Sequence, residues 1–147
     1  MGDGSAWNPV ASTAAENRFL RNNAGAVVLF LGTTRELTGE RRTLSLDYEC
    51  YPEMAVKKMR EVADEVRAKF PITGIGILHR TGRLKIGETS LLVAVSSPHR
   101  KDAFDACHWC VDRIKEVVPV WKKEHWADGS AWVEGHAVDS PEGASTS

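Results

Sequence analysis

The chain has few of the features that mark secreted, membrane or nucleic-acid-binding proteins. Three cysteines in 147 residues argue against the disulfide framework of a small secreted domain. No apolar run reaches the roughly 18 residues that cross a bilayer, and residues 1–5 lack the basic and apolar regions of a signal peptide. A net charge of −1 gives no support for general nucleic-acid binding. We therefore expect a cytoplasmic enzyme or binding module in which any anion recognition is local.

Motifs of common nucleotide-binding and hydrolytic enzymes are also missing. There is no Gly-x-Gly-x-x-Gly, no P-loop and no nucleophile-elbow serine. Cys107 and Cys110 invite a thiol-redox or zinc interpretation, but they fall within a predicted helix rather than at its N-terminus. A zinc site needs a second ligand pair, and His79, His125 and His136 show no metal-binding spacing. Buried structural cysteines are the favoured interpretation, and redox or zinc chemistry is the alternative.

The composition is typical of one globular domain. With 42% hydrophobic and 27% charged residues, a chain of this length can bury a core without disulfides or metals. Residues 1–10 and 137–147 are rich in Gly, Ser, Pro and Asp, so we expect both ends to be flexible. The single domain is then predicted to span residues 11–136.

The hydrophobic pattern predicts two strands before the first helix. Residues 25–32 form a short apolar run between glycines, which is typical of a buried strand. Residues 33–42 are polar, which favours an exposed loop. In residues 43–50 apolar and polar side chains alternate, as in a half-buried strand. The apolar positions of that strand are Leu44, Leu46, Tyr48 and Cys50.

Two helices and three further strands follow. A helix is expected from Pro52 to Phe70, because apolar residues recur there every three or four positions and Pro71 ends the run. Strands are expected at 72–79, 89–96 and 131–136. The inner face of a second helix is marked by Ala103, Cys107, Cys110, Ile114 and Val117. This order predicts an α+β fold with two main helices and a mixed or antiparallel sheet built from hairpins.

A basic segment near the C-terminal end says most about function. His99 and Arg100 lie where the second helix begins, and the unpaired N–H groups of a helix N-terminus favour a phosphate or carboxylate. The alternative is that Arg100 pairs with Asp102 and His99 merely ends a strand. Arg35, at the start of the loop after the first strand, is a second candidate. Its alternative is an ordinary surface arginine.

Lys115 and Lys122 are seven residues apart around a proline. Pro119 would clash with the carbonyl of Lys115 in a continuous helix, so we expect the helix to end near Val118. Trp121 and Lys122 should then fold over its end. In a pocket where Val118, Val120 and Trp121 limit water, a lysine pKa falls and the amine becomes an acid, base or nucleophile. A solvated lysine near a helix C-terminus is the alternative.

Taken together, these segments resemble the large, catalytic subunit of molybdopterin synthase over most of residues 24–136. The order of six pieces, rather than any one of them, makes the resemblance specific. They are Gly25-Ala26-Val27-Val28 with Gly32-x-x-Arg35; Tyr48-Glu49-x-Tyr51-x-x-Met54-Ala55; His79-Arg80-x-Gly82-x-Leu84-x-x-Gly87-Glu88; Ser97-x-His99-Arg100-x-x-Ala103-Phe104; Lys115 with Pro119-x-Trp121-Lys122-Lys123-Glu124; and Trp132-Val133-Glu134.

The resemblance implies an α/β-hammerhead-like fold and a sulfurtransferase that completes the dithiolene of molybdopterin. Its substrate would be cyclic pyranopterin monophosphate. Sulfur would arrive as a thiocarboxylate on the C-terminal glycine of a small ubiquitin-like partner. Two large subunits would form a central homodimer within a heterotetramer, and no metal or organic cofactor, nucleic acid or membrane would take part. The alternative is a non-catalytic phosphate-ligand-binding or assembly module of the same fold.

The resemblance also implies roles for particular residues. Thr33, Thr34 and Arg35 would hold the pterin phosphate, together with His99 and Arg100 donated across the dimer. Lys115 would be the principal catalytic residue. Family members often carry an arginine shortly after the Trp-Val-Glu segment, where this chain has Gly135-His136. A histidine there would make an anion contact weaker and pH-dependent.

The resemblance implies a second group of residues in the same pocket. Lys122, also catalytic, would line it with Lys123 and Glu124 and contact the thiocarboxylate tail.

Overall fold

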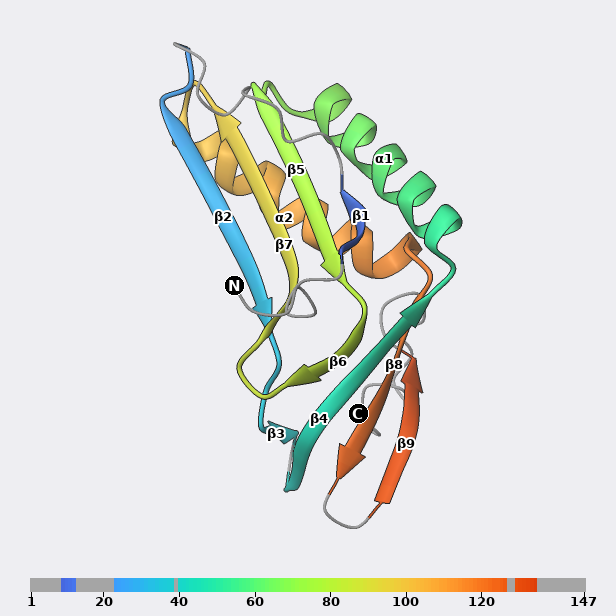
Figure 1. The fold of residues 1–147 in the computed structure, drawn as a ribbon. Helices are drawn as coiled ribbons and strands as arrows, with labels where there is room; N and C mark the ends of the chain where they lie inside the picture. Colours follow the sequence, from blue (N-terminus) through green and yellow to red (C-terminus); the bar gives the residue numbers. More distant parts are fainter. Residues whose placement is uncertain (1–8, 13–22, 39, 127–128, 135–147) are drawn as a thin grey trace.

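A computed structural model describes residues 9–12, 23–38, 40–126 and 129–134 as an α+β fold, which confirms the predicted class (Figure 1). Its two helices and two antiparallel sheets occur in the following order along the chain. The elements are β1 (Pro9–Ser12), β2 (Ala26–Thr33), β3 (Leu37–Thr38), β4 (Arg41–Cys50), α1 (Pro52–Lys69), β5 (Gly74–Arg80), β6 (Gly82–Lys85), β7 (Thr89–Ser97), α2 (Arg100–Val117), β8 (Val120–Trp126) and β9 (Gly129–Glu134).

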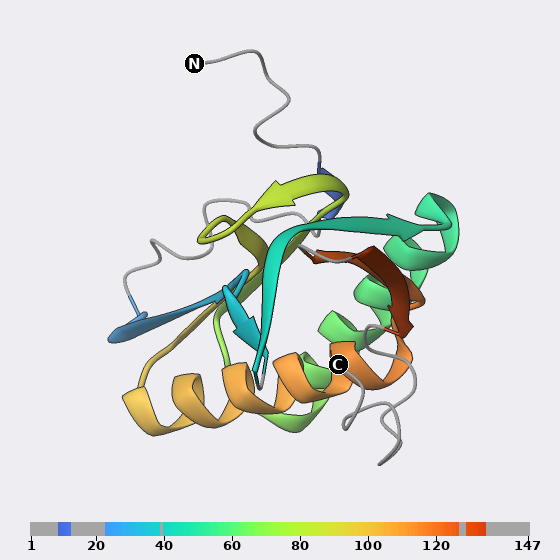
Figure 2. The same cartoon turned by 90° about the horizontal axis from the view of Figure 1, so that it is seen from below.

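The first sheet has the strand order β1-β5-β7-β2, and both helices pack against one of its faces (Figures 1 and 2). The inner faces of the helices are the predicted ones. Ala55, Met59, Val62 and Val66 of α1 are buried, as are Ala103, Cys107, Cys110 and Ile114 of α2. All of these side chains except Ala103 join the valines and isoleucines of β5 and β7 in one core.

The second sheet has the order β3-β4-β8-β9, with β6 paired along β4. The two sheets meet where the ring of Tyr48 on β4 contacts the edge of His79 on β5, with 5.3 Å between the ring centroids. Leu84 of β6 is fully buried beside them. Strand β4 lies between β6 and β8. It also forms a hairpin with β3, so it connects the β3–β4 hairpin to the C-terminal hairpin of β8 and β9.

Strands β6 and β8 were missed by the sequence prediction. The connection 80–88 was expected to be a loop, but Gly82–Lys85 pairs with β4. Residues 121–122 were expected to fold over the end of α2, but they lie in a seven-residue strand between β4 and β9. The charged run Lys-Lys-Glu-His gives no apolar alternation, and the strand forms because its two neighbours satisfy its backbone hydrogen bonds.

The predicted exposed loop 33–42 is also partly wrong. Leu37 and Thr38 form β3, a short hairpin partner of Arg41 and Arg42. Thr34 is buried, because its backbone pairs with the β6–β7 connection rather than with solvent. The polar composition of this segment did not reveal the burial of Thr34, because Thr34 bonds to Gly87 and Glu88, which are distant in the sequence.

The predicted alternation of β4 fails at its start because of a β-bulge. The register shifts between Thr43, opposite Trp126, and Ser45, opposite His125. Leu44, expected to face the core, is therefore 51% exposed, and Thr43, expected to face solvent, is 2% exposed. A bulge adds one residue to a strand and so reverses the direction of the side chains beside it.

Several predictions concern segments outside the described residues. These are the flexible segment 1–10, except for Pro9 and Val10, which belong to β1, the flexible tail 137–147, and His136. In the part of the chain that the structure describes, neither helix is long and apolar enough to cross a membrane.

Candidate functional site

Two basic side chains from separate parts of the fold lie within electrostatic range of a third, Lys122. Arg35 follows β2, Lys115 lies in the last turn of α2, and Lys122 is the third residue of β8. The charges of Arg35 and Lys115 both act on Lys122. Arg35 and Lys115 are exposed, whereas Lys122 is half-buried. The sequence-predicted lysines and the loop arginine thus belong to one basic cluster, which we define as Arg35, Lys115 and Lys122.

The end of α2 sets the spacing of the two lysines. The helix closes with a hydrogen bond from the Val118 N–H to the Ile114 carbonyl at 2.9 Å, and Pro119 follows. This confirms the predicted helix end. The chain then turns directly into β8, with the Val120 N–H donating to the Val118 carbonyl at 2.9 Å. Lys115 therefore lies in the last turn of the helix, and Lys122 is the third residue of the next strand.

Burial and neighbouring cations lower the pKa of Lys122 below its ordinary value. Burial is the largest cause, and the charges of Arg35 and Lys115 act in the same direction. The carboxylate of Glu124 opposes them. A lowered pKa was expected for a lysine near Pro119, and in the structure Lys122 is the lysine whose pKa burial and neighbouring cations lower.

The hydrophobic wall of this site differs in one respect from the prediction. Val118 and Val120 are fully buried, as expected. Trp121 alternates with Lys122 along β8 and so lies on the opposite face of the strand. Its half-exposed ring contacts the ring of Tyr51 edge to face, with 5.5 Å between the centroids. Trp121 therefore does not form part of the wall around Lys122.

Glu124 lies on the same face of β8 as Lys122, but it is 2% exposed. Its Oε1 accepts a hydrogen bond from the Thr43 hydroxyl at 3.2 Å and another from the Trp126 indole N–H at 2.8 Å. The carboxylate thus faces protein donors. The sequence prediction placed Glu124 in the site and missed Thr43 and Trp126, because the bulge that turns Thr43 inward leaves no sequence signal.

Lys123 faces the other side of the sheet. Its neighbour across the strands is Asp47, whose carboxylate binds Arg83 through Oδ1 at 2.9 Å and His125 through Oδ2 at 2.6 Å. The Arg83 guanidinium is the largest cause that lowers the pKa of Asp47 to about 2. The structure therefore separates Lys123 from Lys122, although the two are adjacent in sequence.

The loop that carries Arg35 is fixed to the β6–β7 connection. The Thr34 N–H donates to the Glu88 carbonyl at 3.0 Å, and the Gly87 N–H donates to the Thr34 carbonyl at 2.9 Å. The Thr34 hydroxyl also donates to the Glu88 carbonyl, at 3.2 Å. Thr33 is exposed at the end of β2. Arg35 thus follows a turn that is held in place by hydrogen bonds. Of the two threonines before it, Thr33 is exposed and Thr34 is buried.

His99 and Arg100 lie at the N-terminus of α2, as predicted, and both are exposed. Fifteen residues of helix separate Arg100 from Lys115, which corresponds to about 22 Å along the helix axis. Within one chain, the His99–Arg100 pair and the basic cluster are therefore two separate places.

Cys107 and Cys110 are buried on the inner face of α2, as the sequence predicted. Burial raises the pKa of Cys107 to about 11 and that of Cys110 to about 12, so both thiols stay protonated near neutral pH. Among the described residues, no group of three or more His, Cys, Asp or Glu side chains is arranged to hold a metal.

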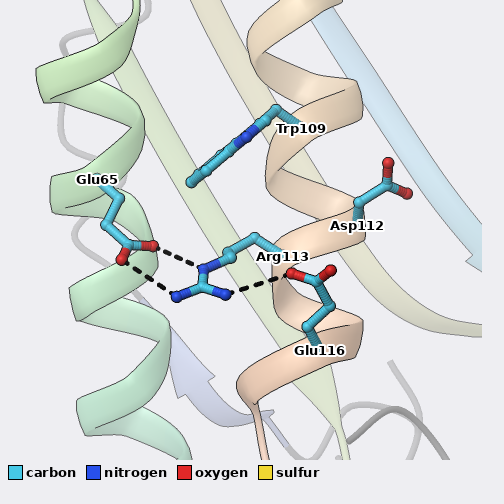
Figure 3. Close-up of a pocket in the computed structure, with 5 residues that line it drawn as sticks. All are labelled: Glu65, Trp109, Asp112, Arg113 and Glu116. Atoms are coloured by element: carbon cyan, nitrogen blue, oxygen red, sulfur yellow. Dashed lines mark hydrogen bonds and ion pairs between the residues drawn. The ribbon is translucent and has the colours of Figure 1, made fainter. Parts of the chain in front are cut away.

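A groove of about 340 Å³ lies between α1 and α2, and its lining includes none of the three residues of the basic cluster (Figure 3). Arg113 bridges the helices across it, with Nε 3.1 Å from Glu65 Oε1 and Nη1 3.3 Å from Glu116 Oε1. Asp112 and Trp109 complete the lining. The three acidic side chains make this groove unsuitable for a phosphate, and its arginine is already paired.

Comparisons with known proteins identify the family of the chain. A family model described as MoaE protein matches residues 6–117. The chain is 44% identical over 138 residues to the molybdopterin synthase catalytic subunit of Halalkalibacterium halodurans, with 92% of this chain and 88% of that protein covered. It is 48% identical over 128 residues to the protein of the same name from Staphylococcus carnosus, with 87% and 85% covered.

Solved structures share the fold. The crystal structure of molybdopterin synthase from Staphylococcus aureus matches with a TM-score of 0.76 at 45% identity, over 86% of this chain and 92% of that chain. A protein–protein complex of subunits 1 and 2 of molybdopterin-converting factor from Helicobacter pylori matches with a TM-score of 0.64 at 19% identity, over 76% and 73%. At that identity the second likeness concerns the fold alone.

Proposed function

The chain belongs to the MoaE protein family, and we propose that it is the catalytic subunit of a molybdopterin synthase, a sulfurtransferase of molybdenum cofactor biosynthesis. The observation that supports this function best is the basic cluster. Arg35, Lys115 and Lys122 come from three elements to one place, and one of them is a lysine with a lowered pKa. Such a cluster suits two anions that must react, a phosphorylated substrate and a thiocarboxylate.

The substrate in this proposal is cyclic pyranopterin monophosphate. Arg35 supplies a permanently charged, forked donor for the phosphate, and the exposed Thr33 hydroxyl lies beside it. Thr34 contributes by holding the turn, since its hydroxyl and backbone are bound to Glu88. Lys115 is exposed at the open side of the cluster, where it meets the reacting atoms and balances negative charge or moves a proton as sulfur adds.

The sulfur donor is the C-terminal thiocarboxylate of a small ubiquitin-like partner. Lys122 binds this anion in its ammonium form, because a charged donor in a partly desolvated site makes a strong hydrogen bond. The thiocarboxylate sulfur bonds to a carbon of the pterin side chain as a C–O bond of that carbon breaks, and the oxygen leaves bonded to phosphorus or as water. Water then cleaves the acyl–sulfur bond, which returns the partner as a carboxylate and leaves a thiolate on the pterin. Two such transfers complete the dithiolene, so the spent partner must leave and a charged one must bind.

A second copy of the chain completes the site. Its His99 and Arg100 would reach the phosphate, since the same residues of one chain lie about 22 Å from Lys115. The outer face of β2, an edge strand, supports self-association because Val27, Leu29 and Leu31 are each about half exposed along it. The full assembly is then a homodimer with one small subunit at each end, working in the cytoplasm without nucleic acid or membrane.

The proposal requires no metal or organic cofactor. It is tested by mixing the purified chain with a thiocarboxylated ubiquitin-like partner and cyclic pyranopterin monophosphate, and assaying molybdopterin. Lys115→Ala should abolish most of the product, whereas Lys101→Ala, an exposed lysine on the same helix paired with Asp105, should not. Tight substrate binding without product from the wild type would instead favour the non-catalytic binding module.

A further inference from the structure

A buried acidic side chain lies directly behind the basic cluster. Glu124 is two residues beyond Lys122 on the same face of β8, which places the two residues about 7 Å apart along the strand. Its carboxylate is enclosed, with the Thr43 hydroxyl and the Trp126 indole N–H bound to one oxygen. A carboxylate so enclosed is poorly placed to contact an anionic substrate or tail, and its charge acts on its neighbours.

The surroundings of Glu124 hold it in one position. The bulge in β4 turns Thr43 to the Glu124 side of the sheet, where an unbulged strand would present Leu44. Trp126 is held in turn, because the guanidinium carbon of Arg41 lies 3.8 Å from the centre of its ring. Both donors to the carboxylate therefore come from fixed side chains.

The charges around Lys122 oppose one another. Arg35, from the β2 loop, and Lys115, from α2, are cations that disfavour a third positive charge, and burial acts in the same direction. Tyr48 lies opposite Lys122 on β4, where it is buried and has a raised pKa, so it stays neutral. Glu124, on β8 itself, supplies the negative charge that favours the ammonium.

We propose that Glu124 is a positioning residue whose carboxylate, clamped by Thr43 and Trp126, keeps the side chain of Lys122 charged within the basic cluster. The proposal rests on the proposed function for its purpose, since only a charged Lys122 binds the thiocarboxylate of the sulfur carrier. It replaces the expectation that Glu124 touches the tail itself.

The test is a direct titration of Lys122 in the free protein. Lysines labelled with ¹³C at Cε are followed by NMR against pH, and the Lys122 signal is assigned by its loss in Lys122→Arg. Glu124→Gln keeps a carbonyl oxygen that can accept from both donors, so the fold should persist. The Lys122 pKa should fall by roughly one unit in Glu124→Gln. It should be unchanged in the control Glu49→Gln, an exposed carboxylate on the other face of β4.

Two further measurements separate positioning from substrate contact. The alkaline decline of sulfur-transfer activity should move to lower pH by the same amount in Glu124→Gln. Thr43→Val removes one clamp without changing charge and should give a smaller shift in the same direction. An unchanged Lys122 pKa in folded Glu124→Gln would overturn the proposal, as would a raised KM for the carrier with an unchanged pH profile.

Because the titration needs no substrate, it remains decisive if the sulfur-transfer function itself fails. Absence of product from the wild type with a normal Lys122 response would disprove the proposed function and leave the electrostatic role of Glu124 standing. If Glu124→Gln does not fold, the Thr43→Val titration decides: a shift supports the proposal and no shift contradicts it.

Discussion

Burial lowers the pKa of Lys122 in β8, and the positive charge of Lys115, in the last turn of the preceding helix α2, acts in the same direction. Between the two lysines the helix is capped at Val118, Pro119 follows, and the strand begins at Val120. Val118 and Val120 are buried. The fold therefore brings the two lysines near one another, and the charge of Lys115 acts on Lys122. Four predictions follow from this and from neighbouring features.

Replacing Lys122 by arginine should separate the need for charge from the need for an amine that titrates. Arginine keeps its charge at all accessible pH values, whereas the pKa of Lys122 lies below that of an ordinary lysine. Wild-type activity should fall as the pH rises through this lowered pKa. Lys122→Arg should retain part of the activity and lose that decline, and Lys122→Ala should be nearly inactive. A decline at the same pH in wild type and Lys122→Arg would assign it to another group.

Removing Arg35 should weaken substrate binding more than turnover. A charge-assisted contact to phosphate contributes about 1.5 to 3 kcal/mol, so Arg35→Ala should raise the KM for the pterin about 10- to 100-fold. Steady-state kinetics with saturating carrier measures this split. Arg42→Ala is the matched control, because Arg42 is an exposed arginine of β4 that pairs with Glu36 at 2.8 Å. An equal effect of both variants would contradict a phosphate role for Arg35.

Activity should be recovered by mixing two inactive variants if Arg100 acts across a dimer. In a mixed dimer of Lys115→Ala and Arg100→Ala, one site keeps Lys115 from one chain and Arg100 from the other. Random mixing should restore about a quarter of wild-type activity, since half the dimers are mixed and each has one intact site. The molybdopterin assay after subunit exchange measures this. No recovery, with exchange verified by mass spectrometry, would place Arg100 in its own chain's site or outside the chemistry.

The bridge between the helices should contribute little to stability and nothing to catalysis. Arg113 and Glu65 are partly exposed, so solvent screens their ion pair and their coupling energy should be small. A double-mutant cycle with Arg113→Ala and Glu65→Ala, followed by urea unfolding, gives this value. All three variants should form molybdopterin at the wild-type rate. A large loss of activity would show that the groove of Figure 3 takes part in function.

Apolar periodicity predicted the helices and the central strands correctly. The inner faces of α1 and α2 are the expected residues, and Pro71 and Pro119 follow the two helices at the expected places. Strand β8 could not be predicted in this way because charged side chains occupy inward positions of the strand. Lys122 and Glu124 occupy positions where a purely structural strand would carry apolar side chains, and they remove the signal.

The candidate site was predictable in its residues and not in its arrangement. Sequence reasoning found Arg35, Lys115 and Lys122, but the exclusion of Trp121 and Lys123 follows from the two-residue period of a strand that was not expected. The role of Thr43 depends on a single extra residue in β4. Such a register shift is decided by pairing with distant strands, so no local pattern reveals it.

The central claim is that this chain moves sulfur from the thiocarboxylate of a small carrier to a phosphorylated pterin at the basic cluster. A single-turnover reaction, followed by mass spectrometry of the carrier together with the molybdopterin assay, tests it most directly. The account predicts that two thiocarboxylates become carboxylates for each molybdopterin formed, and that Lys115→Ala stops both changes while Lys101→Ala stops neither. Carrier that keeps its sulfur in the presence of wild-type protein and substrate would contradict it.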